Sequence, residues 1–362
     1  KPVIQILPIK DESAKALPIV AEISVPKGET LLPPKAFANG VVATNAKLLE
    51  STESDGRTVH KYQWDANLPT DQRILLQVVA STQSKIIDVQ ERIFERKQMP
   101  PRRSPRLFVS TVGIDRYRDS QIQRLDFAVN NATQVAKVLE SHSAPVYRQE
   151  ASVALVNEQA NRQSWKNAIR SQLQQLKTEV SPDDLFVIFL SGHGLRDPAN
   201  GDYLYVGADA RYEDLMSQRY GDCISFSDLS QFADIPCRKL VILDTCHAGA
   251  INLDQRRELK SALRMLQDDM IFTLTASQGN EEAVELREKK LGRFTHRLLE
   301  ALNGAADATD GNRDGVTNFS EVISYVKRTV RQDSQQDTYQ QEPAAGPIEL
   351  LRYADFPLTS SN

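Results

Sequence analysis

Two stretches of the chain carry the residue types of a thiol hydrolase. The apolar run 240–243 leads into Asp-Thr-Cys-His-Ala-Gly, which contains Cys246. Earlier, the apolar run 185–190 leads into Ser-Gly-His-Gly, which contains His193. A thiol is a useful nucleophile as its thiolate, and a neighbouring imidazole supplies the base. Alone, a Cys is more often a small core residue, but together Cys246 and His193 indicate nucleophilic catalysis.

Both apolar runs have the composition of strands buried in a parallel sheet. In open α/β sheets the carboxyl ends of such strands carry ligands and chemistry. We therefore expect Cys246 and His193 to face each other there, each on a Gly-containing turn. Gly192 and Gly194 lack side chains, which leaves room for a peptide beside His193. The N–H groups of Gly194 and Cys246 are suited to hold an oxyanion.

Strands and helices alternate from residue 107 onward. The pattern predicts strands at 107–114, 185–190, 240–243 and 270–275, a hairpin at 203–206, and helices at 125–139, 161–177, near 225–233, 294–302 and 319–330. This alternation predicts an α/β domain at 107–355, with a mostly parallel sheet flanked by helices.

The first part of the chain has a different pattern. Residues 1–95 contain short alternating apolar segments separated by turn clusters, which predicts a small all-β immunoglobulin-like sandwich domain. It contains no catalytic constellation, so we interpret it as a structural or docking module. Residues 96–106 are basic and rich in proline, which indicates a linker.

The composition excludes several classes of protein. The formal net charge of −4 does not favour bulk nucleic-acid binding, and no apolar run is long enough for a membrane span. The three cysteines argue against a disulfide framework and favour a reducing, cytoplasmic location. Because the sequence begins at Lys1, we expect it to be a fragment of a longer protein.

The two motifs around His193 and Cys246 resemble the signatures of caspase-like cysteine peptidases, in the metacaspase or bacterial caspase-like branch. Further similarity lies in residues 112–117, 275–278, 292–295 and 341–343, and the resemblance covers residues 106–352. It implies that His193 is the general acid/base and Cys246 the nucleophile, with a thioester intermediate. It also implies protein or peptide substrates and no required cofactor.

The same resemblance implies cleavage after a basic residue. Asp244 lies two residues before Cys246, and a carboxylate there suits a guanidinium group. Ser191 also matches a pocket position of the metacaspase branch. That branch usually has an Asp where this chain has Asn131, so one charge is missing. We expect Arg to be preferred over Lys.

Two further motifs suggest regulation. Arg256 and Arg257 lie in the connection where caspase relatives are often cut, so they are candidate self-cleavage sites or simply an exposed helix start. Residues 310–321 match the twelve-residue EF-hand loop. The ligands of an optional calcium ion would be Asp310, Asn312, Asp314, Val316 through its carbonyl, Asn318 and Glu321. The alternative is a tight turn that uses Gly311 and Gly315.

These observations predict a cysteine endopeptidase that cuts after basic residues and is optionally self-processing and calcium-modulated. The alternative is a catalytically silent caspase-fold module for signalling or scaffolding, against which the intact Cys246–His193 pair argues. Some bacterial proteins that the chain resembles carry a WD-repeat propeller before such domains. The resemblance therefore also implies a sensor domain upstream of Lys1 in a longer chain.

Overall fold

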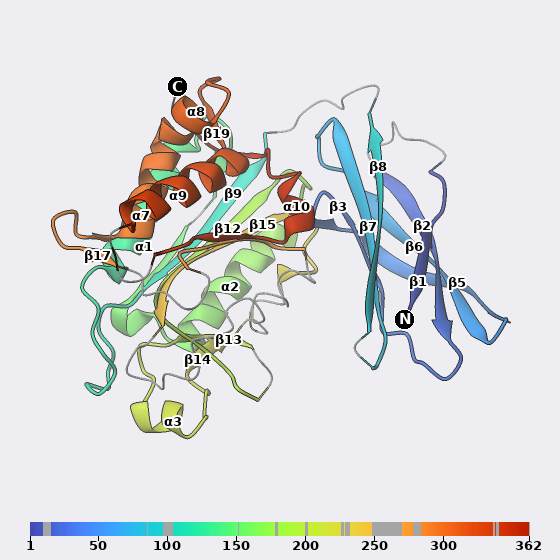
Figure 1. Ribbon diagram of the computed structural model, residues 1–362, viewed down its shortest axis with the longest axis horizontal. Helices are drawn as coiled ribbons and strands as arrows, with labels where there is room; N and C mark the ends of the chain where they lie inside the picture. Colours follow the sequence, from blue (N-terminus) through green and yellow to red (C-terminus); the bar gives the residue numbers. More distant parts are fainter. Residues whose placement is uncertain are drawn as a thin grey trace. The chain divides into compact units, whose positions relative to one another are not determined.

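The structure is a computed structural model that describes most of the chain (Figure 1). The described residues are 1–9, 16–84, 86–96, 104–150, 152–177, 180–199, 202–225, 228, 232–247, 270–277, 284–335, 337 and 340–361. They divide into two units. Unit 1 comprises residues 1–103 with the segments 179–184 and 233–238, and unit 2 comprises the rest. The sequence pattern did not predict that these two later segments belong to unit 1.

Unit 1 is built from two antiparallel four-stranded sheets. The first has the order β1 (Val3–Ile6), β2 (Ala16–Pro26), β6 (Arg57–Asn67), β5 (Thr44–Ser54), and the second β4 (Val41–Val42), β3 (Lys35–Ala38), β7 (Arg73–Ser81), β8 (Ile87–Glu95). Alternate residues of β2 are buried in a shared core that contains Trp64 and Phe94. This period of two confirms a β domain at the start of the chain. Its immunoglobulin-like character stays a prediction.

An ion cluster holds the later segments of the chain within unit 1. Arg238, only 5% exposed, contacts Asp71 through Nη2, and its Nη1 lies 3.4 Å from Asp183 Oδ1. The backbone N–H of Thr70 donates to the same Asp183 oxygen at 2.9 Å. Arg238 is the first residue of β15 (Arg238–His247), so this strand begins at a buried ionic anchor.

Unit 2 contains a mostly parallel sheet, as the sequence predicts. Its strand order is β10 (Arg148–Gln149), β9 (Arg106–Gly113), β12 (Leu185–Arg196), β15, β16 (Phe272–Thr275), β20 (Ala344–Gly346). In addition, β11 (Val153–Val156) pairs with β9. A further strand, β13 (Tyr203–Val206), pairs with β12 and with β14 (Cys223–Ser225). β9 runs parallel to β10, β11 and β12, and β15 runs parallel to β16. β20 is antiparallel.

Helices cover both faces of this sheet (Figure 1). The longer ones are α1 (Ala128–His142), α2 (Arg162–Lys177), α7 (Arg293–Glu300) and α9 (Phe319–Asp333). On β9, a Cβ on Gly113 would meet α1 at Ala128 O, whereas Ser110 donates to Gln172 of α2. Residues three apart on a strand face opposite sides, so α1 and α2 lie on opposite faces. Burial on both faces explains the continuous apolar runs of β12 and β15.

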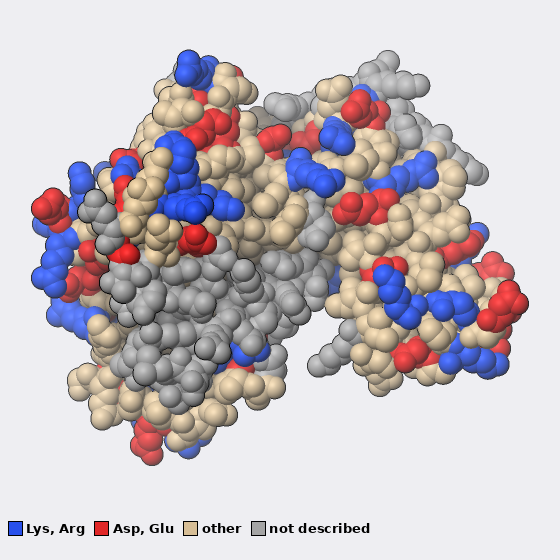
Figure 2. All heavy atoms as spheres, viewed as in Figure 1, with Lys and Arg blue, Asp and Glu red and all other residues tan. Residues whose placement is uncertain are grey.

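Shorter elements complete unit 2. They are η1 (Asn157–Gln159), α3 (Tyr212–Met216), β17 (Glu285–Leu286), β18 (Leu291–Gly292), η4 (Ala301–Ala305), α8 (Ala306–Asp310), β19 (Val316–Asn318), α10 (Ile348–Leu351) and β21 (Pro357–Ser360). Acidic and basic side chains are interspersed on the face drawn in Figure 2. Within the described ranges, no helix has both the length and the apolar character needed to cross a membrane.

Several predicted boundaries are wrong. β12 continues through Arg196, so His193 lies within a strand that pairs with β13 rather than on a turn. β15 likewise extends through His247 and includes Cys246. α1 begins three residues later than predicted, at Ala128. Most of the helix predicted near 225–233 lies outside the described residues.

Candidate functional site

The backbones of His193 and Cys246 lie at corresponding positions of two adjacent strands. β12 and β15 are neighbours in the sheet, and the N–H of Arg238 donates to Asp184 O at 3.0 Å where the two strands begin. His193 follows Asp184 by nine residues, and Cys246 follows Arg238 by eight. Strands that start together advance equally per residue, so the two residues approach the same edge of the sheet. The side chain of Cys246 lies outside the described part of the structure.

The imidazole of His193 is buried, with 2% exposure, and its tautomer is fixed by one contact. Its Nε2 lies 2.7 Å from the backbone carbonyl oxygen of Gln123. A carbonyl oxygen accepts hydrogen bonds and never donates them, so Nε2 carries the proton. In the neutral ring the lone pair is then on Nδ1, which makes Nδ1 the basic atom.

The two glycines beside His193 accommodate tyrosines. A Cβ on Gly192 would lie 2.6 Å from the hydroxyl of Tyr205, and a Cβ on Gly194 would meet that of Tyr203. These hydroxyls donate to Ser191 O and to Thr245 Oγ1, each at 2.7 Å. The expectation that both glycines leave room for a peptide is therefore wrong on this side of the strand, where two buried aromatic rings fill the space.

The three predicted pocket residues meet around one carboxylate. The side-chain amide of Asn131 donates to Asp244 Oδ2 at 3.2 Å and to Ser191 Oγ at 3.1 Å. The hydroxyl of Thr295, on α7, donates to the same Asp244 oxygen. Asp244 is only 4% exposed. The structure thus brings together Asp244, Ser191 and Asn131, and it adds Thr295, which the sequence analysis missed.

The orientation of Asn131 explains why an amide suits this position. Its Oδ1 accepts a hydrogen bond from the N–H of Gly292 at 3.0 Å, which turns its Nδ2 toward Asp244. A carboxylate at position 131 could not donate to Asp244 and would place a second negative charge against it. Gly292 is required by packing, because a Cβ there would lie 2.9 Å from Asp244 Oδ2.

Burial raises the pKa of Asp244 from its ordinary value to about 6. The hydrogen bonds from Thr295 lower this pKa, while the nearby charge of Glu285 raises it. Ionising Asp244 in the folded protein therefore costs about 3 kcal/mol relative to the unfolded chain. A carboxylate held at this cost is poised to gain from a cationic ligand.

A second carboxylate lines the same pocket. Glu285, on β17, is part of a wall that also contains Leu125, Ala128, Gly192, Val284 and Gly292. Its Oε1 accepts the N–H groups of Asp126 and Phe127, just before α1, at 3.0 and 3.1 Å. No sequence motif points to Glu285, because only the fold brings it to the pocket. The cavity is about 10 Å³, near the lower limit for one water molecule.

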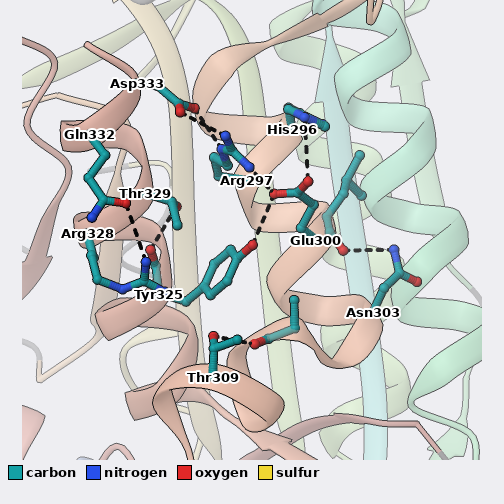
Figure 3. Close-up of polar contacts among 12 residues, drawn as sticks. His296, Arg297, Glu300, Asn303, Thr309, Tyr325, Arg328, Thr329, Gln332 and Asp333 are labelled. Carbon is teal, nitrogen blue, oxygen red and sulfur yellow. Dashed lines mark hydrogen bonds and ion pairs between the residues drawn. The ribbon is translucent and has the colours of Figure 1, made fainter. Parts of the chain in front are cut away.

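A polar network on the other side of α7 fixes the helix that carries Thr295 (Figure 3). Arg297 donates to Asp333 of α9 through Nε and Nη2, at 2.7 and 2.8 Å, and to Glu300 through Nη1 at 2.6 Å. The hydroxyl of Tyr325 on α9 donates to the same Glu300 oxygen at 3.1 Å. The bidentate Arg297–Asp333 pair and the Glu300 oxygen that Arg297 and Tyr325 share attach α7 to α9. These contacts help to fix the position of Thr295 on α7.

The carboxylates of the EF-hand-like loop are satisfied by the protein itself. Glu321 accepts the N–H groups of Asn312 at 3.2 Å and Asn318 at 2.9 Å. Asp310 pairs with Arg328, at 2.6 Å from Nη2 to Oδ2, and this ion pair lowers its pKa.

Asp307, outside the predicted ligand set, accepts the N–H groups of Asp314 and Gly315 at 3.1 and 3.0 Å. Asp314 accepts the N–H of Val316 at 2.8 Å. Within the described residues, no three His, Cys, Asp or Glu side chains are grouped to hold a metal. Calcium binding through the full predicted ligand set, which also includes Asn side chains and a backbone carbonyl, stays a prediction.

The candidate self-cleavage residues Arg256 and Arg257 lie outside the described residues. Gly194, the predicted oxyanion donor, lies in β12 opposite Tyr205 of β13. The described part of the site comprises His193 and the pocket around Asp244.

The chain was compared with protein families, curated proteins and solved structures. The family model described as "Caspase domain" matches residues 108–350. A search of curated proteins found no match. Among solved structures, one described as "structure of pro-sf-caspase-1" is 10% identical, has a TM-score of 0.40, and is aligned over 67% of this chain and 92% of its own. Because the family model spans more than half of the sequence, the chain belongs to the caspase family of cysteine peptidases.

Proposed function

We propose that the chain is a cysteine endopeptidase that cleaves proteins after basic residues, with Arg preferred over Lys. The observation that carries this proposal is the buried carboxylate of Asp244, which lines a cavity shared with Ser191 and Gly192. Ser191 and Gly192, which line this cavity, immediately precede His193 in β12. An acidic pocket beside the reacting residues suits a cationic side chain on the substrate.

In the proposed reaction, the Nδ1 lone pair of His193 takes the thiol proton of Cys246. The thiolate sulfur attacks the carbonyl carbon of the scissile bond, and the C=O electron pair moves to oxygen. The N–H groups of Gly194 and Cys246 stabilise this oxyanion, each such donor being worth about 3–4 kcal/mol. When the intermediate collapses, the C–N bond breaks and the amine leaves with the proton from His193.

The second half of the reaction releases the acid product. The thioester carbonyl is attacked by water, and His193 takes the water proton as general base. The C–S bond then breaks and the proton returns to the sulfur. The Nε2–H contact to Gln123 O supports both halves, because it keeps Nδ1 as the atom that accepts and releases protons.

Two carboxylates account for the basic specificity in this proposal. Asp244 offers a buried acceptor, and Glu285 adds a second negative charge at the pocket wall. The planar guanidinium group can bind a carboxylate through two parallel hydrogen bonds, which favours Arg over Lys. The cavity of about 10 Å³ is too small for a guanidinium, so substrate entry requires its wall to move.

Matched fluorogenic peptides with Arg, Lys or Asp before the cleaved bond test this proposal. We expect turnover of the Arg peptide, weaker turnover of the Lys peptide, and none in the Cys246→Ala variant. Preference for the Asp peptide would overturn the specificity, and equal turnover in Cys246→Ala would overturn the nucleophile.

Self-processing at Arg256 or Arg257 follows from the same specificity. Mass spectrometry of the purified wild type beside Cys246→Ala tests it. A cut after either arginine that appears only in the wild type supports self-processing, and the same cut in both proteins refutes it.

A further inference from the structure

One tyrosine contacts His193 in two independent ways. The backbone N–H of His193 donates to the hydroxyl oxygen of Tyr117 at 2.9 Å. The ring of Tyr117 also stacks on the imidazole, with ring centroids 5.1 Å apart and an angle of 23° between the planes. The first contact fixes the position of the backbone, and the second restricts the rotation of the imidazole.

The same loop supplies the third contact to His193. Tyr117 and Gln123 both lie between β9 and α1, and the N–H of Leu125 donates to Asp115 O at 2.9 Å, which closes the loop. The carbonyl of Gln123 accepts the Nε2–H of His193 at 2.7 Å. Residues 115–125 therefore form a loop that holds the backbone, ring face and Nε2 edge of one histidine.

Polar and apolar contacts anchor this loop. Asp119 accepts the N–H of Gln121 at 2.9 Å and that of Tyr212, the first residue of α3, at 2.8 Å. The N–H of Arg118 donates to Ala208 O at 2.8 Å. Ile122, 3% exposed, is buried in a hydrophobic cluster that includes residues of β12, β13 and β14, against which Tyr117 and Tyr212 also pack. The loop thus has several attachments besides Tyr117.

We propose that Tyr117 is a positioning residue for the proposed general base, His193. The inference rests on the proposed function. The stacked ring keeps the imidazole in the plane in which Nε2–H meets the Gln123 carbonyl, and this keeps Nδ1 as the basic atom that serves the thiol of Cys246 in the proposed reaction. The hydroxyl fixes the strand backbone immediately before Gly194, the proposed oxyanion donor.

The two contacts predict different losses. Tyr117→Phe keeps the ring and removes the acceptor of the His193 N–H, so kcat should fall about 3- to 10-fold. Tyr117→Leu removes the ring as well, and misplacement of a reacting group can cost about 100-fold in kcat. KM for the Arg peptide should change less than about 2-fold in both, because Tyr117 is not among the residues that line the pocket.

Tyr212→Leu is the matched control. Tyr212 packs against the same hydrophobic cluster as Tyr117, and no contact of its ring with His193 is found in the described structure. Its bond to Asp119 uses the backbone N–H and survives the substitution. A loss of stability from removing a ring should therefore appear in both variants, whereas the loss of kcat should appear only in Tyr117→Leu.

The experiment measures kcat, KM, melting temperature and the rate of Cys246 alkylation by iodoacetamide across pH. We expect alkylation of Tyr117→Leu to follow a shifted pH profile, with partial rescue in Tyr117→Phe and a wild-type profile in Tyr212→Leu. If Tyr117→Leu keeps kcat within about 2-fold of an active wild type, the positioning role is refuted. A wild type that turns over no peptide, and whose Cys246 alkylation profile is unchanged in His193→Ala, instead refutes the proposed function.

Discussion

Two groups of carboxylates in unit 2 have opposite environments. Around Asp244, burial and the charge of Glu285 raise the pKa to about 6, and the hydrogen bonds of Thr295 compensate only in part. In the EF-hand-like loop, Asp307 and Glu321 each accept two backbone N–H groups, and Asp310 is paired with Arg328. Both groups are acidic side chains in Gly-containing segments, yet burial opposes the charge of Asp244, whereas the carboxylates at the loop accept backbone N–H groups or an ion pair.

In the proposed function, this difference separates a cation-binding pocket from a structural turn. A carboxylate whose charge is opposed by the fold lowers its free energy when a cation arrives. A carboxylate whose charge is already compensated by N–H groups or an ion pair gains less from a cation. A motif of acidic residues is therefore a better predictor of a cation site when burial opposes the charge of its carboxylates than when the protein already compensates that charge.

The largest effect is expected from Asp244→Asn. Removing one partner of a buried charge pair costs about 2–5 kcal/mol, so kcat/KM for the Arg peptide should fall about 30-fold or more. Steady-state kinetics measure this change. The loss should be much smaller for a citrulline peptide, in which a neutral group of the same shape replaces the guanidinium.

The same variant should be more stable than the wild type above neutral pH. The folded pKa of Asp244 is raised, so its contribution to folding is complete below pH about 4 and is lost as the pH rises through about 6. At about pH 8, Asp244→Asn should be more stable by up to about 3 kcal/mol, and the gain should vanish near pH 4. Urea unfolding at both pH values measures the difference, and an equal effect at both would contradict it.

The pH dependence of kcat/KM should follow the ionisation of Asp244. The acid limb of kcat/KM for the Arg peptide should lie near pH 6, because only ionised Asp244 attracts the guanidinium. Thr295→Val removes a hydrogen bond that lowers this pKa, so the limb should move to higher pH. If the limb stays in place in both Thr295→Val and Asp244→Asn, another group controls it.

Substitutions at the EF-hand-like loop should change the free energy of unfolding and leave activity unchanged. Glu321→Gln keeps one acceptor oxygen for the Asn312 and Asn318 N–H groups and loses the other, and the Asn318 bond is the capping interaction at the start of α9. The lost bond should cost about 1–2 kcal/mol of unfolding free energy. Arg328→Gln should cost under about 1 kcal/mol, because Arg328 is 41% exposed. Unchanged kcat/KM in both variants is expected, and a large change in activity would contradict a purely structural loop.

The smallest effect is expected from calcium. Because the contacts favour a metal-free turn, addition of calcium or a chelator should leave the melting temperature and kcat/KM unchanged. Calorimetric titration tests this directly. A binding isotherm that is lost in Asp314→Ala would support the calcium site predicted from the sequence and contradict the structural reading.

Much of the fold could be predicted from the sequence, since period-two segments mark the β domain and apolar runs mark buried strands. The pairing of Asp244, Ser191 and Asn131 followed from family motifs, and the structure brings them together. Glu285 and Thr295 could not be predicted, because their roles depend on where β17 and α7 pack. The contacts of Asp307 and Arg328 with the calcium-loop motif could not be predicted either, because both residues lie outside that motif.

The most direct test compares Arg and citrulline peptides in the wild type and in Asp244→Asn. The account predicts that the wild type prefers Arg over citrulline by about 100-fold in kcat/KM, and that the preference falls to near unity in the variant. Equal preference in both proteins would contradict the central claim that the buried Asp244 carboxylate selects a basic residue.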